Sequence, residues 1–271
     1  MKYRVITPRY TWKELFTELW DYRDIFLFLG WRDVLVHYKQ TVIGIAWVVL
    51  RPLLTVAIFT IIFSRIAGIE SSIAPYPLIV FSAMLAWQFF VDMLTYASNS
   101  FLSNEQLVSK VYFPRIILPA SRILCSSVDF IVSFIFYLIL SLVRYQFIPP
   151  KQIILFPLFF GWLVLVSLSI SLLFASLIVR YRDFRHIVPF VTQLGLYCTS
   201  VGFSLSMVPK SLVLFLGLNP LVGIINGFRW TLLGEPLHIE VMLVSLGVTI
   251  IFSIISLWYF KIAQDTFADA L

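Results

Sequence analysis

Long apolar runs that follow one another through the sequence are the feature that most constrains this chain. The first, from about residue 42 to 64, contains a single charge, Arg51. A helix rises about 1.5 Å per residue, so a run of this length crosses a hydrocarbon core of roughly 30 Å. The chain is 60% hydrophobic and only 13% charged, too little charge to cover the surface of a soluble domain. We therefore predict an all-α integral membrane protein.

Six transmembrane helices are expected from these runs. The remaining five fall at about 77 to 101, 116 to 143, 153 to 179, 187 to 206 and 239 to 260.

Residues 207 to 238 are harder to interpret. They contain two apolar pieces separated by Asn219-Pro220, and neither piece is long enough to span alone. A re-entrant helix pair between the fifth and sixth spans is expected here, with a continuous seventh span as the alternative.

The segment before the first span carries a helix signal. Thr11 and Glu14 have the spacing of a capping box, and apolar residues then recur at helical intervals opposite a charged face. This pattern is typical of an amphipathic helix lying in the membrane interface, and the alternative is a soluble helix packed on a partner subunit. We divide the chain into a cytoplasmic interface region, residues 1–41, and a membrane domain, residues 42–271.

Lys and Arg residues fix the expected orientation. Most of those outside the spans fall in the N-terminal region and in the segments on its side of the membrane. By the positive-inside rule, both termini are expected in the cytoplasm. The net charge of +6 is therefore interpreted as topology and not as nucleic-acid binding. Cys125 and Cys198 have no CxxC spacing, so neither a zinc site nor a disulfide framework is predicted.

Four charged residues fall well inside the predicted spans. A charge in a membrane helix costs about 2.5 to 3.5 kcal/mol on insertion scales, so each is expected to face protein or water. Arg122 and Asp129, on the third span, lie seven positions apart and share a helix face. Asp92 is the expected counter-ion for Arg51 or Arg122. The four are Arg51, Asp92, Arg122 and Asp129.

The sequence lacks the motifs of common enzymes. None of its eleven glycines is followed by lysine, which excludes a Walker A phosphate loop. There is no HExxH or GxSxG motif, and the three histidines are far apart. We predict no catalytic or metal-binding site.

Several short motifs occur in a fixed order. Near the N-terminus, Arg32 and Tyr38-Lys39-Gln40-Thr41 precede Gly44-x-x-Trp47 and Pro52. The others are Lys110-Val111-Tyr112-Phe113-Pro114-Arg115 with Pro119, then Asn219-Pro220, Arg229 and the terminal Phe267-Ala268-Asp269. Together with the six-span layout, they resemble the permease subunit of bacterial polysaccharide ABC exporters of the ABC-2 type, over essentially the whole chain.

The resemblance implies a homodimer of this chain bound to two copies of a separate ATPase. ATP and Mg would bind to that partner, and this chain would hold no cofactor. The cargo would be a lipid-linked polysaccharide such as O-antigen, carried from the cytoplasm to the periplasm across the bacterial inner membrane. Teichoic acid or capsular polysaccharide export is the nearest alternative. An ion-coupled secondary transporter or a membrane transferase is more remote.

The resemblance also implies residue roles. Residues 103–115 become a coupling helix, and the helix before Gly44 an interface helix that contacts the ATPase. The residues expected at this ATPase contact are Arg32, Tyr38, Lys39, Asn104, Glu105, Lys110, Tyr112, Phe113, Pro114 and Arg115. Asn219, Pro220 and Arg229 would belong to a periplasmic gate.

Aromatic residues make up 17% of the chain, and sugar rings pack their C–H faces on aromatic rings. We therefore expect some aromatic side chains to line a substrate channel, the alternative for each being contact with lipid or packing within the chain. The candidates are Trp47, Phe59, Phe63, Trp87, Tyr197 and Phe203.

Overall fold

The structure, a computed structural model, describes residues 20–39, 45–66, 68, 74–264 and 267. Over these residues the chain is helical and no strand is present, as predicted. The expected capping box at Thr11 and Glu14 lies outside the described residues, as do Gln40, Thr41 and Gly44 of the N-terminal motif.

Five helical segments are long and apolar enough to cross a membrane. They match the first, second, third, fourth and sixth expected spans, with boundaries shifted by a few residues. The segments are α3 Ile45–Phe59 with its π-helical continuation η1 Thr60–Ile66, α4 Tyr76–Ser98, α7 Ile117–Ile139 with η2 Leu140–Arg144, η3 Lys151–Leu155 with α8 Phe156–Arg180, and α12 Ile239–Ala263.

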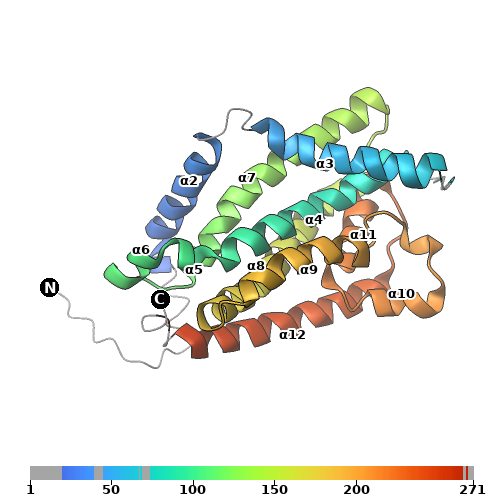
Figure 1. The fold of residues 1–271 in the computed structure, drawn as a ribbon. Helices are drawn as coiled ribbons and strands as arrows, with labels where there is room; N and C mark the ends of the chain where they lie inside the picture. The colour runs from blue at the N-terminus through green and yellow to red at the C-terminus, as the bar shows by residue number, and fades with distance from the viewer. Residues whose placement is uncertain (1–19, 40–44, 67, 69–73, 265–266, 268–271) are drawn as a thin grey trace.

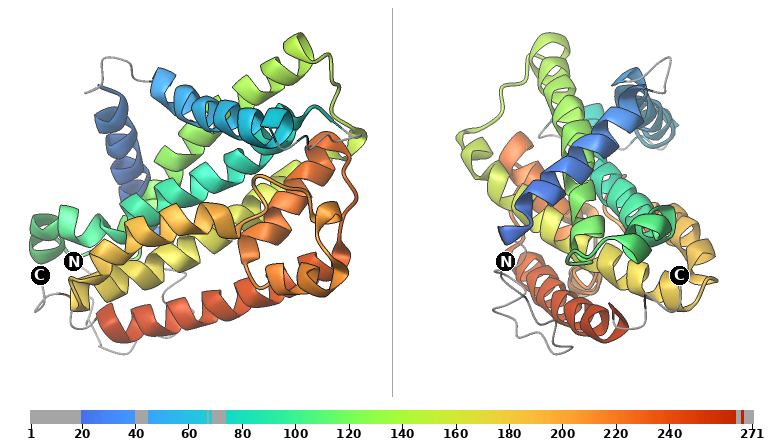
Figure 2. Two further views of the ribbon diagram at one scale, coloured as in Figure 1. Left: turned by 45° about the vertical axis from the view of Figure 1, so that its right-hand side comes forward. Right: turned by 90° about the vertical axis from the view of Figure 1, so that its left-hand side faces the viewer.

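Helix α4 lies at the centre of the bundle, in contact with α7, α8 and α3 (Figure 1). Most of its side chains are buried, whereas α3 and α12 each leave a broad apolar face exposed. Figure 2 shows α12 along one outer edge of the bundle and α3 along another. A helix with an apolar face on the outside fits a bundle whose solvent is lipid.

Hydroxyl groups join α8 to α12. The Trp162 indole N–H donates to Thr249 at 2.9 Å, and the Ser169 and Ser253 hydroxyls lie 2.8 Å apart. Ser167 and Ser171 on α8 are fully buried. In lipid, the hydrophobic effect does not drive two helices together. Small and hydroxyl-bearing residues instead allow the helices to approach closely and to form hydrogen bonds.

The expected fifth span, 187 to 206, is not a continuous helix. Helix α9 covers Phe184–Cys198, which is 15 residues and shorter than the roughly 20 that a span needs. The segment after it, 199–204, is irregular. The prediction of six full-length spans is therefore not confirmed: five helices meet the length and composition criteria in the described chain.

Side chains from elsewhere in the chain bind the carbonyl groups of the irregular segment and stabilise it. The Arg229 guanidinium donates to the Phe203 carbonyl at 2.7 Å and to the Val201 carbonyl at 2.9 Å. The Tyr76 hydroxyl donates to the Gly202 carbonyl at 2.7 Å. Non-helical backbone is tolerated at membrane depth only where protein satisfies its polar groups, and sequence periodicity does not reveal these distant partners.

Two short helices follow, α10 Lys210–Leu216 and α11 Pro220–Leu233. The Asn219 side chain accepts a hydrogen bond from the Leu221 amide at 3.1 Å and so caps α11. Gly234, with φ of 74°, ends the helix in the left-handed region that favours glycine. Helix α10 contacts α12, and α11 contacts α12, α4 and α8.

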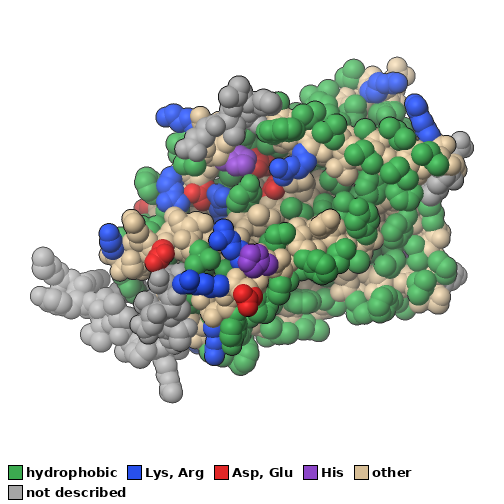
Figure 3. Space-filling model, in the orientation of Figure 1, with side chains coloured by type: hydrophobic (Ala, Val, Ile, Leu, Met, Phe, Trp, Pro, Cys, Tyr) green, Lys and Arg blue, Asp and Glu red, His purple; other side chains and the backbone are tan. Residues whose placement is uncertain are grey.

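The opposite end of the bundle carries three further helices, α2 Arg23–Lys39, α5 Ser100–Ser103 and α6 Glu105–Lys110. Helix α6 lies within residues 103–115, where the resemblance implies a helix. In Figure 3, Lys, Arg, Asp and Glu side chains gather over this end, and hydrophobic side chains cover most of the remaining visible face. We call it the charged end of the bundle.

Candidate functional site

Arg122 and Asp129, which were predicted to share a face of the third span, hold helix α2 on α7. The Arg122 Nη1 atom lies 3.1 Å from Asp33 Oδ2, and both side chains are mostly buried. Asp129 accepts a hydrogen bond from the Tyr38 hydroxyl, and His37 Nε2 lies 3.7 Å from Asp129 Oδ2. Burial and the neighbouring Asp129 carboxylate raise the pKa of the Tyr38 hydroxyl, which therefore stays protonated and able to donate.

This arrangement corrects one expectation. Arg122 forms an ion pair with Asp33 and not with Asp92. Asp92 instead accepts a hydrogen bond from Gln88 at 2.9 Å, and within the described chain no Lys or Arg nitrogen lies within 4.0 Å of its carboxylate. The expectation considered only charges within the spans, so it did not anticipate that α2 would supply the partner of Arg122.

Helix α2 and the segment 103–115, which were predicted separately as contacts to a partner, lie against each other. Arg32 Nη2 donates to Asp33 Oδ1 at 2.8 Å and to Asn104 Oδ1 at 3.1 Å. The Asn104 amide donates to the Ser100 carbonyl at 2.9 Å. Arg32 thus joins α2 to the start of α6, and the two form one surface at the charged end.

The residues expected at the ATPase contact differ in exposure. Lys39, Glu105, Lys110 and Tyr112 are exposed. Phe113 is buried, at 5% exposure, and its role within the chain is packing. The others are at least partly covered: Arg32, Tyr38, Asn104, Pro114 and Arg115.

An aromatic cluster anchors this loop to the end of the chain. The buried Phe267 ring lies 4.8 Å from Phe101 and 5.9 Å from Phe260, between ring centroids. The Arg115 guanidinium lies 5.8 Å from the Phe267 ring centroid and donates to the Gln264 carbonyl. Phe267 stood out in the sequence only as part of a terminal motif, and Phe101 and Phe260 carried no signal apart from being apolar.

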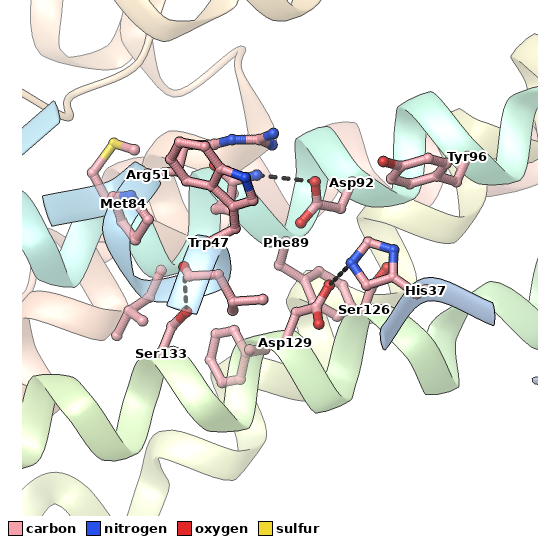
Figure 4. A pocket seen from close by; sticks show the side chains of 15 residues that line it. His37, Trp47, Arg51, Met84, Phe89, Asp92, Tyr96, Ser126, Asp129 and Ser133 are labelled. Atoms are coloured by element: carbon pink, nitrogen blue, oxygen red, sulfur yellow. Dashed lines mark hydrogen bonds and ion pairs between the residues drawn. The ribbon is translucent and has the colours of Figure 1, made fainter. Parts of the chain in front are cut away.

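A polar pocket of about 120 Å³ lies between α3, α4 and α7, and we call it the inner pocket. Figure 4 shows Trp47 and Arg51 of α3 and Asp92 of α4 facing a space that Asp129 and Ser133 of α7 border from below. Among the described residues, no carboxylate lies within 4.0 Å of the Arg51 guanidinium. Arg51 is exposed and lines the inner pocket.

A second pocket, of about 630 Å³, opens at the charged end and is called the outer pocket. Its lining includes Arg32, Asn104 and Arg122, and it shares His37 and Tyr96 with the inner pocket. The two pockets therefore adjoin. Polar side chains follow each other from the surface at α6 to the space between α3 and α4.

The aromatic residues proposed for a channel occupy different environments. Trp47 and Tyr197 are 51% and 71% exposed. Trp87 is buried, and a Cβ atom at Gly195 on α9 would lie 2.6 Å from its ring.

The Phe59 and Phe63 rings are half-buried and stacked, with centroids 5.5 Å apart. A Cβ atom at Gly202 would lie 2.7 Å from Phe59, so these two rings cover the irregular segment. Phe203, within that segment, is also half-buried.

The residues expected at a gate lie at the end of the bundle away from α6. Arg229 is 1% exposed and binds the carbonyls after α9, as described above. Glu235, also buried, accepts a hydrogen bond from Ser204 at 3.0 Å in the same region. Asn219 caps α11, which Pro220 begins. Arg229 thus has a structural role that the sequence did not indicate.

A bundle of apolar helices with charged helices at one end and a polar pocket within the bundle defines a multi-pass membrane protein. The chain belongs to the ABC-2 type transporter family, whose profile matches residues 25–233. It is similar to a protein of Klebsiella pneumoniae called O-antigen export system permease protein RfbA, with 26% identity over 92% of this chain and 95% of that protein. A protein of the same name from Myxococcus xanthus is 25% identical over 95% of this chain and 99% of that protein.

Proposed function

We propose that this chain is the transmembrane permease subunit of an ATP-driven exporter that moves a lipid-linked, O-antigen-like polysaccharide from the cytoplasm to the periplasm. The family match supports transport, and the names of the relatives in Klebsiella and Myxococcus support the polysaccharide cargo. Two copies of the chain would form the channel, in the inner membrane of a bacterium.

ATP hydrolysis is assigned to a separate partner, with one ATPase subunit per copy of this chain and with ATP and Mg bound there. The family match supports this assignment. The hydrogen bond of Arg32 to Asn104, which joins α2 and α6 into one surface, indicates where the partner would bind. Exposed Glu105, Lys110 and Tyr112 offer that surface to a partner. A force applied to α6 passes through Arg32 and Asp33 to Arg122 on a long helix.

The charged end is proposed to face the cytoplasm, with both termini on that side. This orientation follows the positive-inside rule, since Arg180, Arg182, Arg185 and Lys261 join the basic residues of α2 and α6. Helix α9 would make the sixth crossing together with the irregular segment that follows it. Helices α10 and α11 would then be a re-entrant pair that forms a gate on the periplasmic side.

The channel is proposed to run between the two copies. Helices α3 and α9 both contact α4 and leave aromatic side chains exposed, including Trp47 and Tyr197. Helix α2 would lie in the membrane interface, since its Phe28 and Trp31 side chains are 69% and 62% exposed.

Purification of the tagged chain from its native membrane in mild detergent tests this function. We expect an ATPase subunit in near-equal amount, lost when Glu105→Lys and Lys110→Glu reverse the charges of α6. Lys151→Glu, at the other end of the bundle, is the matched control and should retain the partner. Recovery of the chain alone, with export abolished by collapse of the proton gradient at constant ATP, would instead support an ion-coupled transporter.

A further inference from the structure

We infer that the inner pocket is a binding subsite for one sugar ring of the transported polymer, in which Trp47 stacks on the ring while Asp92 and Gln88 bind its hydroxyls. The inference rests on the proposed export function and adds a location and a chemistry to it.

The inner pocket has room for part of a single sugar ring. Its volume is about 120 Å³, less than the roughly 150 Å³ of a protein cavity that holds benzene, so the rest of the ring would lie at the exposed border of the pocket. Trp47 borders the pocket and is 51% exposed, so its indole face is available to a ligand. A rigid aromatic wall with a few placed polar groups is the usual composition of a small-ligand site.

The polar groups suit a ligand that carries hydroxyls. The Gln88 amide donates to Asp92 Oδ1 at 2.9 Å, which leaves the other carboxylate oxygen without a protein donor among the described residues. An ionised carboxylate accepts several hydrogen bonds, and an unsatisfied one within a membrane helix is costly. Neighbouring sugar hydroxyls can donate to Asp92 and accept from Gln88 or Arg51.

The charges disfavour a phosphate group as the ligand. Two carboxylates, Asp92 and Asp129, line the inner pocket and would repel an anion. Arg51 is the facing guanidinium, and the other potential cation, His37, lies 3.7 Å from Asp129. A neutral sugar ring avoids this repulsion, whereas a phosphate group does not.

A route leads to the inner pocket from the charged end. The outer pocket shares His37 and Tyr96 with it and begins beside Asn104 at the start of α6. Asp92 lies six residues before Ser98, the last residue of α4, which is about 9 Å along the helix. A polymer entering from the cytoplasmic side would therefore meet this subsite soon after it leaves water.

Photo-crosslinking in the complete exporter tests the subsite. A photoreactive amino acid would replace Trp47 or Gln88 in cells that make the polymer, and the purified chain would be stained for attached carbohydrate. The matched control is Trp258 on α12, which is 58% exposed and belongs to a helix that contributes no residue to the inner pocket. A strain blocked in polymer synthesis provides the background.

We expect carbohydrate on the chain labelled at position 47 or 88 and background staining at position 258. Asp92→Asn should lower the yield at position 47 by about tenfold, the cost of losing a charge-assisted hydrogen bond. If Asp92→Asn fails to assemble with its partner, Gln88→Leu takes its place and the same loss is expected.

Staining at positions 47 and 88 no stronger than at 258, with clear staining at Tyr197, would overturn the subsite while leaving the export function in place. If deletion of the chain left surface polysaccharide unchanged, the proposed function itself would fail. An unchanged yield in both Asp92→Asn and Gln88→Leu would overturn the assignment of these two side chains.

Discussion

The Asp33 carboxylate and the Arg122 guanidinium lie 3.1 Å apart and connect a surface helix to a membrane-spanning helix. Asp33 also accepts from Arg32, whose guanidinium reaches Asn104 at the start of α6. The connection therefore has α6 at one end and α7 at the other. An ion pair that joins two helices can transmit displacement between them, because breaking it leaves a mostly buried charge without a partner.

Separation of this pair should weaken the attachment of α2. Arg122→Ala or Asp33→Ala is expected to lower the free energy of unfolding by about 1 to 3 kcal/mol and to reduce substrate-stimulated ATPase activity of the assembled complex. Thermal unfolding in detergent and an ATPase assay measure the two effects.

The exchanged double variant, Asp33→Arg with Arg122→Asp, is the control for the pair itself. It should recover part of both losses, because the interaction is restored with its direction reversed. Arg144→Ala removes an exposed arginine at the other end of the bundle and should change neither quantity. Additive losses in the exchanged variant would show that the two residues do not act through each other.

Loss of Arg229 should destabilise the segment after α9. Arg229→Ala leaves the carbonyls of Val201 and Phe203 without their donors, at an expected cost of about 3 kcal/mol or more. Arg229→Lys should recover little, because a single ammonium does not reproduce a planar fork that reaches two carbonyls. The midpoint of thermal unfolding and the yield of folded protein test this, and an equally stable Arg229→Lys variant would contradict it.

The Phe267 cluster should control the position of α6. Phe267→Ala removes a ring buried against Phe101 and Phe260 and is expected to cost about 3 to 5 kcal/mol. It should also reduce recovery of the ATPase partner, since Arg115 loses the ring that it covers. Phe215→Ala, which removes a ring that is 69% exposed, serves as the control and should retain both stability and partner.

Two helical glycines should respond in opposite directions to alanine. A methyl group at Gly227 on α11 would overlap the Phe159 ring, so Gly227→Ala is expected to destabilise the chain by about 1 to 3 kcal/mol. A methyl group at Gly247 on α12 would meet no atom within 4 Å, and Gly247→Ala should be neutral or stabilising by up to about 1 kcal/mol. Circular dichroism on heating distinguishes the two.

Much of the fold was predictable because the membrane constrains it. Five of the expected spans appear as long helices, since a hydrocarbon core demands an apolar run of fixed length. The short helix within 103–115 was also predictable, because Glu105 and Lys110 mark a polar segment too short to cross. The fifth span was predicted too long, because the helix ends at Cys198. After that residue, Arg229 and Tyr76 bind the backbone in place of helical hydrogen bonds.

For the candidate site, the sequence by itself determined which residues carry charge within the membrane domain, because each exception to an apolar run is visible in the order of the residues. Only the tertiary structure decided their partners. It assigned Arg122 to Asp33 and Asp129 to Tyr38, and it left Asp92 beside Gln88 in a pocket. The physical reason is that an ion pair depends on distance, and α2 approaches α7 through packing of Gly30 against Leu124, a contact that no periodicity specifies.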